Sequence, residues 1–459
     1  MKLVLIGAGS AVFTRGLVAD LILSPEMGPL ELGLVDTEPE ALQVAEDLCS
    51  RMIRSRDADI RVIADIDRRE VLPAADVVVT TIGVGGRRSW EADVLVPREH
   101  GIFQPVGDTV MPGGISRAMR MIPALVDIAR DVGSICPHAQ FYNYSNPMTA
   151  NCWAILEATG VPVTGLCHGT FDVQRQLASL IGAPSKQVSS LYAGINHLTF
   201  IFDLRWHGRD AWPIVRARLA KERGQPVDTD FLDRQFPDMA APSQSFKVSD
   251  NPFSWSLFDS YDAYPAVNDR HVTEFFPERF PKGQYFGKTL GVDVFSLEAT
   301  TARGDQNFEK MRAQARGNQP LDEGVFNRTP GEHEQLVSII KAIKEDTRRV
   351  FAVNLPNNGA VPNLPDDAVL ELPAIATSGG MRPIQILNFP DPLVAILTRK
   401  LAATRVTVDA AMAGNRHLLS EALLLDGAVT DLDMAQILGE KLIETHRVHL
   451  PNFYPLEAR

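Results

Sequence analysis

The first 190 or so residues alternate short apolar runs with amphipathic stretches, and this alternation constrains the fold more than any other feature. A strand–helix–strand repeat with Val- and Ile-rich strands is typical of a doubly wound parallel sheet covered by helices. The expected strands are Lys2–Ile6, Leu30–Val35, Ile60–Ala64, Val77–Ile82, Gln140–Tyr144 and Val161–Leu166. The expected helices are Thr14–Leu23, Glu38–Arg54, Ser116–Val132, Ala150–Ala158 and Asp172–Leu180. The sequence therefore predicts an α/β fold whose N-terminal domain, residues 1–193, is Rossmann-like.

The first expected strand leads directly into a glycine-rich turn, Gly7-Ala8-Gly9-Ser10, and a helix follows. Glycines at such a turn let the backbone approach a pyrophosphate, whose charge is stabilised by the helix N-terminus. The third glycine of the usual motif is absent, since Val12 stands in its place, so a plain strand–helix turn is the alternative.

Two later strand ends also favour a dinucleotide. Asp36 ends the second expected strand, where a carboxylate can accept hydrogen bonds from both ribose hydroxyls and so favours NAD over NADP. The alternative is that Asp36 caps the helix before Glu38. The fourth strand ends in small residues, from Thr81 through Gly83 to Gly86, that can lie against the cofactor. We therefore expect NAD⁺ to contact Gly7, Gly9, Ser10, Asp36, Thr81 and Gly83.

The pattern changes after Gly194. His197–Arg205 alternates like a half-buried strand, an irregular stretch follows to about residue 285, and the chain past about residue 295 reads as mostly helical. The helices expected there are Phe295–Arg316, Glu332–Lys344, Pro390–Ala403, Ala410–Leu424 and Met434–Thr445. No flexible linker precedes this half, so residues 194–459 are predicted to form a mostly helical α+β domain, packed on the first and contributing substrate, metal and oligomer contacts.

Composition excludes several classes of protein. The 45 Lys and Arg residues against 57 Asp and Glu give a net charge of −12, and without a basic block we expect no nucleic-acid partner. No stretch approaches the roughly 18 continuous apolar residues of a membrane span. The apolar run in Met1–Ala11 is too short for a signal peptide. The four cysteines are too sparse for a disulfide framework, and we expect a cytoplasmic protein.

A cysteine and a histidine form a possible metal pair. Cys167-His168-Gly169 follows a strand at the edge where open α/β sheets bind ligands, and His197 lies thirty residues further on. A thiolate and an imidazole suit a borderline divalent ion with positions left open for substrate oxygens. Taken alone, both residues could equally be buried structural side chains.

Together with several other blocks, this pair makes the chain resemble the NAD- and metal-dependent glycosidases of glycoside hydrolase family 4, an exception to the two-carboxylate scheme. The resemblance runs end to end. Its blocks are Gly7–Ser10 with Phe13, Gly101–Arg120, Asn143–Pro147, Cys167–Gly169, Gly194–His197, His271–Pro277 and Asn357–Pro365.

The resemblance implies a specific chemistry. In that family NAD⁺ transiently oxidises C3 of the sugar, a base removes the proton from C2, the glycosidic bond breaks by elimination, and water then adds. A divalent metal, typically Mn²⁺, bridges O2 and O3 as a Lewis acid. The cofactor ends each cycle unchanged, so no net NADH is expected.

The resemblance also implies roles for individual residues. Cys167 and His197 match the metal ligands, and Asn146 matches a residue that hydrogen-bonds substrate hydroxyls. His168 matches the position that protonates the leaving oxygen of α-linked substrates, although a plain metal-site or cofactor contact is the alternative. The resemblance also adds Phe13 to the residues expected to bind the cofactor.

The base that removes the C2 proton is assigned to Asp269, with Tyr264 and His271 as rivals, since family members acting on phosphorylated glucosides use a tyrosine in this region. A solvated loop carboxylate is the alternative interpretation of Asp269. Asp108 and His271 are expected to line the sugar site.

Substrate preference in the family follows the residues after the metal cysteine. Cys167-His168-Gly169 is similar to the subgroup acting on α-linked uronic acids, and its glycine would leave room near the sugar. A carboxylate on C5 could then pair bidentately with Arg87, Arg88 or Arg270, each of which could also be a surface or phosphate contact.

We therefore expect an α-glucuronidase or α-galacturonidase that acts on a small sugar acid and forms a homodimer or homotetramer. A neutral α-glucosidase or α-galactosidase of the same family, a simple NAD-dependent dehydrogenase and a non-catalytic nucleotide-sensing or scaffold protein are the alternatives. Accumulation of NADH during turnover would distinguish the dehydrogenase.

Overall fold

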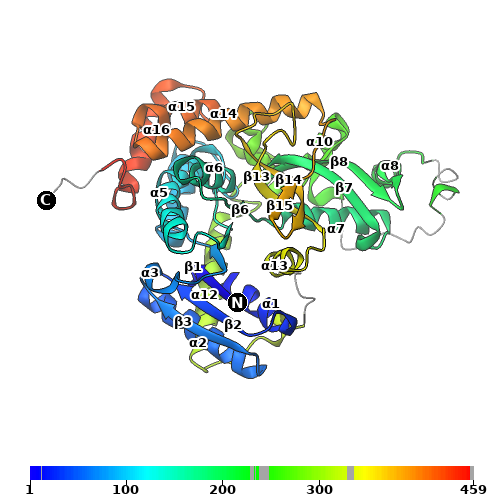
Figure 1. The fold of residues 1–459 in the computed structure, drawn as a ribbon. Helices are drawn as coiled ribbons and strands as arrows, with labels where there is room; N and C mark the ends of the chain where they lie inside the picture. Colours follow the sequence, from blue (N-terminus) through cyan, green and yellow to red (C-terminus); the bar gives the residue numbers. More distant parts are fainter. Residues whose placement is uncertain (12, 228–231, 233, 237–247, 328–334, 455–459) are drawn as a thin grey trace.

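The parallel sheet predicted for the N-terminal half is present. The computed structural model describes residues 1–11, 13–227, 232, 234–236, 248–327 and 335–454 (Figure 1). Six parallel strands lie in the order β6-β5-β4-β1-β2-β3, the order of a doubly wound dinucleotide-binding sheet. Their bounds are β1 Lys2–Ile6, β2 Leu30–Val35, β3 Ile60–Asp65, β4 Val77–Thr80, β5 Gln140–Asn143 and β6 Thr164–Gly165.

The strands alternate their side chains between two buried faces of this sheet. In β1, Leu3 and Leu5 enter the core that contains α1 and α2, whereas Val4 and Ile6 enter the core that contains α5 and α6. Each such side chain stabilises the fold by about 1.5–3 kcal/mol when fully buried. Burial on both faces explains why the strands read as continuous apolar runs.

The five helices expected in this half are confirmed, with ends shifted by a few residues. The predicted helices are α1 Phe13–Ile22, α2 Pro39–Ser55, α5 Met111–Ile135, α6 Met148–Thr159 and α7 Gly169–Ile181. The structure adds α3 Arg68–Val71 and α4 Gly86–Glu99. Helix α5 begins before the predicted Ser116 because Gly114 is there for close packing: a Cβ would lie 2.3 Å from the Thr109 backbone. Helix α4 was not predicted, because glycine and charged residues dominate its first turn.

Antiparallel strands continue the same sheet into the second half. The strands are β7 Val188–Ile195, β8 Leu198–Trp206, β9 Arg209–Asp210, β10 Tyr264–Pro265, β13 Val350–Pro356, β14 Val369–Thr377 and β15 Gly380–Pro383. Asn354 of β13 pairs with Gly165 of β6 and joins the two parts of the sheet. The hairpin β11 Gln284–Tyr285 and β12 Lys288–Thr289 stands apart. The strand expected at His197–Arg205 is confirmed as β8, but β13–β15 lie in a region predicted as mostly helical.

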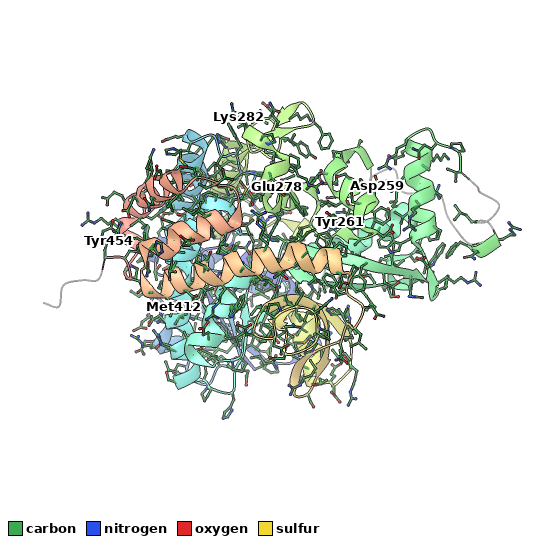
Figure 2. All side chains as sticks on the ribbon, turned by 90° about the horizontal axis from the view of Figure 1, so that it is seen from above. Asp259, Tyr261, Glu278, Lys282, Met412 and Tyr454 are labelled. Carbon is green, nitrogen blue, oxygen red and sulfur yellow. The ribbon has the colours of Figure 1, made fainter. Side chains whose placement is uncertain are left out.

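The remaining helices form the rest of the second half, whose boundary expected between residues 193 and 194 lies inside β7. They are α8 Trp212–Glu222, α10 Pro252–Tyr261, α11 Asn268–Val272, α12 Leu297–Ala315, α13 Leu336–Lys344, α14 Asp391–Ala413, α15 Arg416–Asp426 and α16 Leu432–Thr445. Helix α14, which ends just after Met412, is continuous across Thr404–Asp409, where the prediction placed a break (Figure 2). Val12 and residues 332–334 of an expected helix lie outside the described residues.

Two helices of the second half return to the first. Helix α12 packs against α2, and α13 packs against α1, so the halves share contacts beyond the sheet (Figure 1). None of the helices in the described ranges carries an apolar run long enough to span a bilayer.

Candidate functional site

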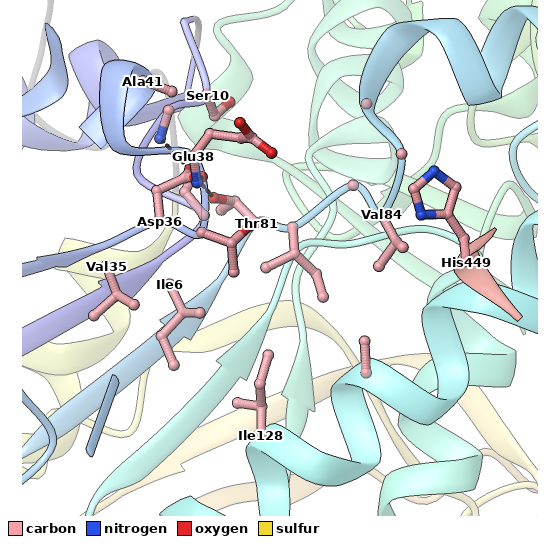
Figure 3. Close-up of a pocket in the computed structure, with 18 of the residues that line it drawn as sticks. Ile6, Ser10, Val35, Asp36, Glu38, Ala41, Thr81, Val84, Ile128 and His449 are labelled. Atoms are coloured by element: carbon pink, nitrogen blue, oxygen red, sulfur yellow. Dashed lines mark hydrogen bonds between the residues drawn. The ribbon is translucent and has the colours of Figure 1, made fainter. Parts of the chain in front are cut away.

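A large cavity opens at the carboxyl ends of β1, β2 and β4; we call it the glycine-turn cavity because Gly7–Ser10 lies in its wall (Figure 3). Its volume is about 1410 Å³. Gly7 has a φ of +97°, and a Cβ there would lie 2.8 Å from the carbonyl carbon of Thr81. Only glycine lets the turn pass this close to the end of β4.

Asp36 fixes the same turn. Its Oδ2 accepts a hydrogen bond from the Gly9 N–H at 2.7 Å, and its Oδ1 accepts one from the Glu38 N–H at 3.1 Å (Figure 3). A Cβ on Gly9 would lie 2.9 Å from that Oδ2, so the glycine makes room for the carboxylate. The N-cap of α2 is Glu38, so the alternative of Asp36 as a helix cap is wrong.

The residues expected to bind the cofactor divide between two cavities. Gly7, Gly9, Ser10, Asp36, Thr81 and Gly83 all line the glycine-turn cavity. Phe13 does not: it lines the second cavity, where its ring packs 4.4 Å from that of Tyr144. His449, which no motif indicated, reaches the glycine-turn cavity from beyond α16 (Figure 3).

The second cavity, about 540 Å³ in volume, adjoins the first; we call it the histidine cavity because His168, His197 and His271 line it. Asn146 and Cys167 line it too, so the structure brings together five of the residues predicted from sequence for metal, proton and substrate contacts. Its wall is shared with the glycine-turn cavity at Ser10, Thr81, Ile82 and Arg117.

Three side chains beside this cavity could hold a cation. Ligand atoms of Asp108, His197 and His271 all lie within 4.8 Å of one another. His197 stands in the turn between β7 and β8 with a φ of +67°, a strained value for a residue with a side chain. Its Nδ1 lies 2.8 Å from the Thr109 hydroxyl, which fixes the imidazole.

Burial sets the charges of this group. Burial lowers the pKa of His197 and lowers that of His271 further, with help from the neighbouring imidazole. Burial alone would raise the pKa of Asp108, but the attraction of His197 and His271 in their protonated forms, and of Arg117, outweighs it and lowers the pKa to about 2. Asp108 is therefore ionised, and burial favours the neutral forms of both imidazoles; a carboxylate and a neutral imidazole are the forms that bind metal ions.

Cys167 follows β6 and stands at the start of α7. Its thiol is partly exposed, and the Gly169 N–H approaches the sulfur at 3.5 Å. His168 is exposed at the N-cap of α7, so its imidazole can exchange protons with solvent. Gly169 does not leave an open space: a Cβ there would lie 2.2 Å from Val267 Cγ1, so Val267 fills the room expected for a substrate carboxylate.

Asn146 links the metal-type cluster to the cavity wall. Its Nδ2 donates to Asp108 Oδ2 at 2.9 Å, and its carbonyl accepts from Arg117 Nε at 3.0 Å. Asp108 was predicted to line the sugar site, but it is not among the residues that line the histidine cavity; it lies behind them, bonded to Asn146 and beside His197.

The structure does not bring Asp269 into either cavity. Its carboxylate is fully buried and accepts hydrogen bonds from the backbone of Phe253 and Ser254 and from the hydroxyls of Ser254 and Tyr285. Tyr264 is also fully buried, with its hydroxyl on Asn268. A sequence pattern cannot show which way a short helix turns its carboxylate, and in α11 it turns into the core.

The three arginines expected to meet a substrate carboxylate are engaged elsewhere. Arg87 and Arg88 both bond Asp305, at 2.7 and 2.6 Å, on the glycine-turn side. Arg270 contacts Thr300 at 3.3 Å and lines neither cavity. Sequence reasoning passed over Arg117, although it lies inside the Gly101–Arg120 block, because nothing local distinguishes it from Arg120.

Comparison with known proteins identifies the family of this site. A family model described as "Family 4 glycosyl hydrolase" matches residues 2–183, and one described as "Family 4 glycosyl hydrolase C-terminal domain" matches residues 192–429. The chain is similar to an alpha-galacturonidase of Bacillus subtilis, with 30% identity over 94% of this chain and 93% of that protein. It is similar to an alpha-glucosidase of Erwinia rhapontici, with 30% identity over 93% of each chain.

A solved structure shares the fold. A 6-phospho-alpha-glucosidase from gut microorganisms, in complex with NAD and Mn²⁺, superposes with a TM-score of 0.81. It is 18% identical and covers 98% of this chain and 99% of that one.

Proposed function

Since this chain belongs to the family 4 glycosyl hydrolases, we propose that it hydrolyses α-linked hexuronides, glucuronides or galacturonides, with NAD⁺ and a divalent cation such as Mn²⁺. The observation that carries the proposal is the shared wall of the two cavities, to which Ser10, Thr81 and Arg117 contribute. A dinucleotide along the glycine-turn cavity can place one end against a sugar in the histidine cavity.

The glycine-turn cavity fits NAD⁺ in particular. Its glycine turn lets the start of α1 approach the cavity, and the Asp36 carboxylate stands at the end of β2, where a 2′-phosphate would meet a like charge. Bound NAD⁺ supplies reversible hydride removal from a sugar carbon. Ser10 and Thr81, at the junction of the cavities, orient the reacting end.

The cation fits the group beside the histidine cavity. Asp108 offers a carboxylate and His197 a neutral imidazole, and ligand atoms of the two lie within 4.8 Å of each other. We assign Asp108, His197 and Cys167 to hold the ion. A bound divalent cation supplies a Lewis acid for the sugar hydroxyl oxygens.

Two histidines move the protons. Of the three groups considered as base, only His271 lines the cavity, and its neutral imidazole can take the proton from C2 of the sugar. His168, exposed at the cavity wall, gives a proton to the leaving oxygen. Asn146 hydrogen-bonds the substrate hydroxyls and keeps Asp108 in place.

The choice of hexuronides rests on Cys167-His168-Gly169 and on the alpha-galacturonidase among the relatives. The alpha-glucosidase of equal identity makes a neutral α-glycoside the second candidate.

The test uses p-nitrophenyl α-glycosides with and without Mn²⁺, NAD⁺ and a reductant. We expect the hexuronide to be cleaved fastest, with activity dependent on both cofactors and no net NADH. In D₂O, deuterium should enter C2 of the released sugar. Activity without NAD⁺ and without C2 exchange would overturn the mechanism, whereas preference for a neutral hexoside with exchange intact would overturn only the substrate class.

A further inference from the structure

Arg117 has a planar guanidinium fork whose two terminal nitrogens have no hydrogen-bond partner among the described residues. It projects from α5 and lines both cavities. Its Nε donates to the Asn146 carbonyl at 3.0 Å, and within the described ranges no carboxylate lies within salt-bridge distance of its guanidinium. Among the described residues that line the histidine cavity, it is the only arginine or lysine.

Arg120, one turn further along α5, shows what a purely structural arginine looks like in this helix. Its two terminal nitrogens both bond the Asp93 carboxylate, and its Nε donates to the Val84 carbonyl at 2.9 Å. The side chains of Arg120 and Asp93 are completely buried. Arg117 has only the Nε bond and remains partly exposed to the cavity.

The surroundings of Arg117 favour an anionic ligand. Burial lowers the pKa of Arg117, and the attraction of Asp108 only partly offsets that effect. Asp108 is itself committed to Asn146 and Thr109 through its two oxygens. A second negative charge in the cavity could therefore pair with the two terminal nitrogens of Arg117, which have no hydrogen-bond partner among the described residues.

We propose that the two terminal nitrogens of Arg117 bind the C5 carboxylate of the hexuronide in a bidentate pair, an assignment that rests on the proposed function. A planar guanidinium matches a carboxylate with two parallel N–H···O bonds. The Nε of Arg117 is bonded to the main-chain carbonyl of Asn146, the residue that holds substrate hydroxyls, while its Nη2 lies beside Gly83, where a Cβ would be 3.6 Å away. Arg117 thereby replaces Arg87, Arg88 and Arg270 as the residue that determines specificity for a sugar acid.

Anionic oxygens could also come from the pyrophosphate of the dinucleotide, because Arg117 lines the glycine-turn cavity as well. The substrate carboxylate is favoured because Arg117 Nε is bonded to Asn146, which lines the histidine cavity and not the glycine-turn cavity. The two sources predict different losses when the arginine is replaced.

The experiment compares the wild type with Arg117→Gln, Arg117→Lys and, as matched control, Arg130→Gln, an exposed arginine on the same helix. The values of kcat/KM are measured for p-nitrophenyl α-glucuronide and α-galacturonide and for their neutral counterparts. The Kd of NAD⁺ and of free glucuronic and galacturonic acid is measured by calorimetry, and folding is checked from Tm.

We expect Arg117→Gln to lower kcat/KM for the hexuronide by about 10–150-fold, because charged hydrogen bonds are lost. The Kd of the free sugar acid should rise by a similar factor. The neutral glycosides and the Kd of NAD⁺ should change by less than about 3-fold. Arg117→Lys should recover part of the loss, because it restores the charge without the fork, and Arg130→Gln should behave as wild type.

Four outcomes would overturn the assignment. An equal loss for hexuronide and neutral glycosides would make Arg117 a structural residue. A weaker Kd of NAD⁺ with uronide preference intact would assign its fork to the pyrophosphate. If the wild type prefers neutral glycosides, the proposed substrate class is wrong and the role of Arg117 is wrong with it. If both Arg117 variants retain the preference for uronides, only the role of Arg117 is wrong.

Discussion

The glycine-turn cavity and the histidine cavity share a wall but are assembled in different ways. The first is built largely from the ends of three strands that are adjacent in the parallel sheet, β4, β1 and β2, with their turns. The second takes residues from the β5 and β6 ends, from the β7–β8 turn and from α5 and α11. Close packing of one turn against its neighbours defines the first cavity, whereas long-range packing of separate segments defines the second.

The cavities also differ in how they treat charge. At the glycine-turn cavity Asp36 is partly exposed and bonded to backbone N–H groups. At the histidine cavity, burial shifts the pKa values of His197 and His271 downward, and the charged groups around Asp108, including Arg117, lower its pKa to about 2. Substitutions in one cavity should therefore separate nucleotide binding from metal-dependent chemistry.

The largest effect is expected for Cys167→Ser. A hydroxyl is a poor substitute for a thiolate ligand, so activity that depends on Mn²⁺ should fall by more than about 100-fold, the upper range for loss of a merely supporting group. The Kd of NAD⁺, measured by calorimetry, should stay within about 2-fold of the wild type, since Cys167 does not line the glycine-turn cavity.

Cys136→Ser is the matched control for this substitution, since Cys136 lies at the end of α5 and lines neither cavity. It should retain activity. Weakened NAD⁺ binding by Cys167→Ser with an unchanged requirement for Mn²⁺ would contradict the separation of the two cavities.

Asp36→Ala tests the other cavity. The change leaves the Gly9 and Glu38 N–H groups without their acceptor and removes the carboxylate expected to bind ribose, so NAD⁺ should bind about 1–3 kcal/mol more weakly. Titration with NAD⁺ and NADP⁺ measures the loss. Glu46→Gln is the control, because Glu46 lies on α2 and lines neither cavity. Better activity of the wild type with NADP⁺ would refute the role of Asp36.

Sequence patterns predict the first cavity better than the second for a physical reason. A strand, a glycine turn and an acidic strand end are local features with fixed spacing, and the structure brings Gly7, Gly9 and Asp36 together as expected. The direction of a side chain from a short helix is not local. Asp269 therefore turns into the core in α11, while His271, two residues later, faces the cavity.

The same distinction applies to the fold. The parallel strands read as continuous apolar runs because both faces are buried, and they were predicted closely. Strands β13–β15 were missed; they pair mainly with one another, and the pairs Asn354 with Gly165 and Glu371 with Gly194 attach them to the rest of the sheet. Arg117 was passed over because only the fold shows that its neighbour Arg120 is paired and it is not.

A smaller effect on the histidine cavity is expected for Glu371, a buried residue of β14. Its carboxylate accepts hydrogen bonds from the Thr170 hydroxyl and from Asn196 Nδ2, the latter at 3.1 Å, and so ties the segment after Cys167 to the segment before His197. Glu371→Ala should weaken activation by Mn²⁺ by about 10-fold, the low end for a supporting group. Glu371→Gln keeps one acceptor and should recover part of the loss.

The measurement is the Mn²⁺ concentration that gives half-maximal activity, with the Kd of NAD⁺ as the internal reference. A change of equal size in both quantities would mean that Glu371 supports the whole fold rather than the spacing of the two ligand segments. An unchanged response to Mn²⁺ in Glu371→Ala would show that the hydrogen bonds of Thr170 and Asn196 do not hold the ligands.

The smallest expected effect concerns stability behind the histidine cavity. Glu274 Oε1 accepts the Val106 and Gly107 N–H groups at 2.8 and 2.7 Å, which positions the turn that carries Asp108. Burial, with the nearby negative charge of Asp108, raises the pKa of Glu274 from 4.5 to about 8. The folded protein thus keeps a proton that the unfolded chain releases, and stability should fall as pH rises from about 4.5 to about 8.

Glu274→Gln keeps an acceptor oxygen and stays neutral at every pH, so it should lose this part of the dependence on pH. Between about pH 6 and about pH 9, calorimetry should show the Tm of the wild type falling a few degrees more than that of the variant. Glu278→Gln, an exposed glutamate one turn further on, should follow the wild type (Figure 2). Parallel profiles for wild type and Glu274→Gln would show that Glu274 is ionised in the folded state, and that the Asp108 turn is held by a charge rather than by a neutral acid.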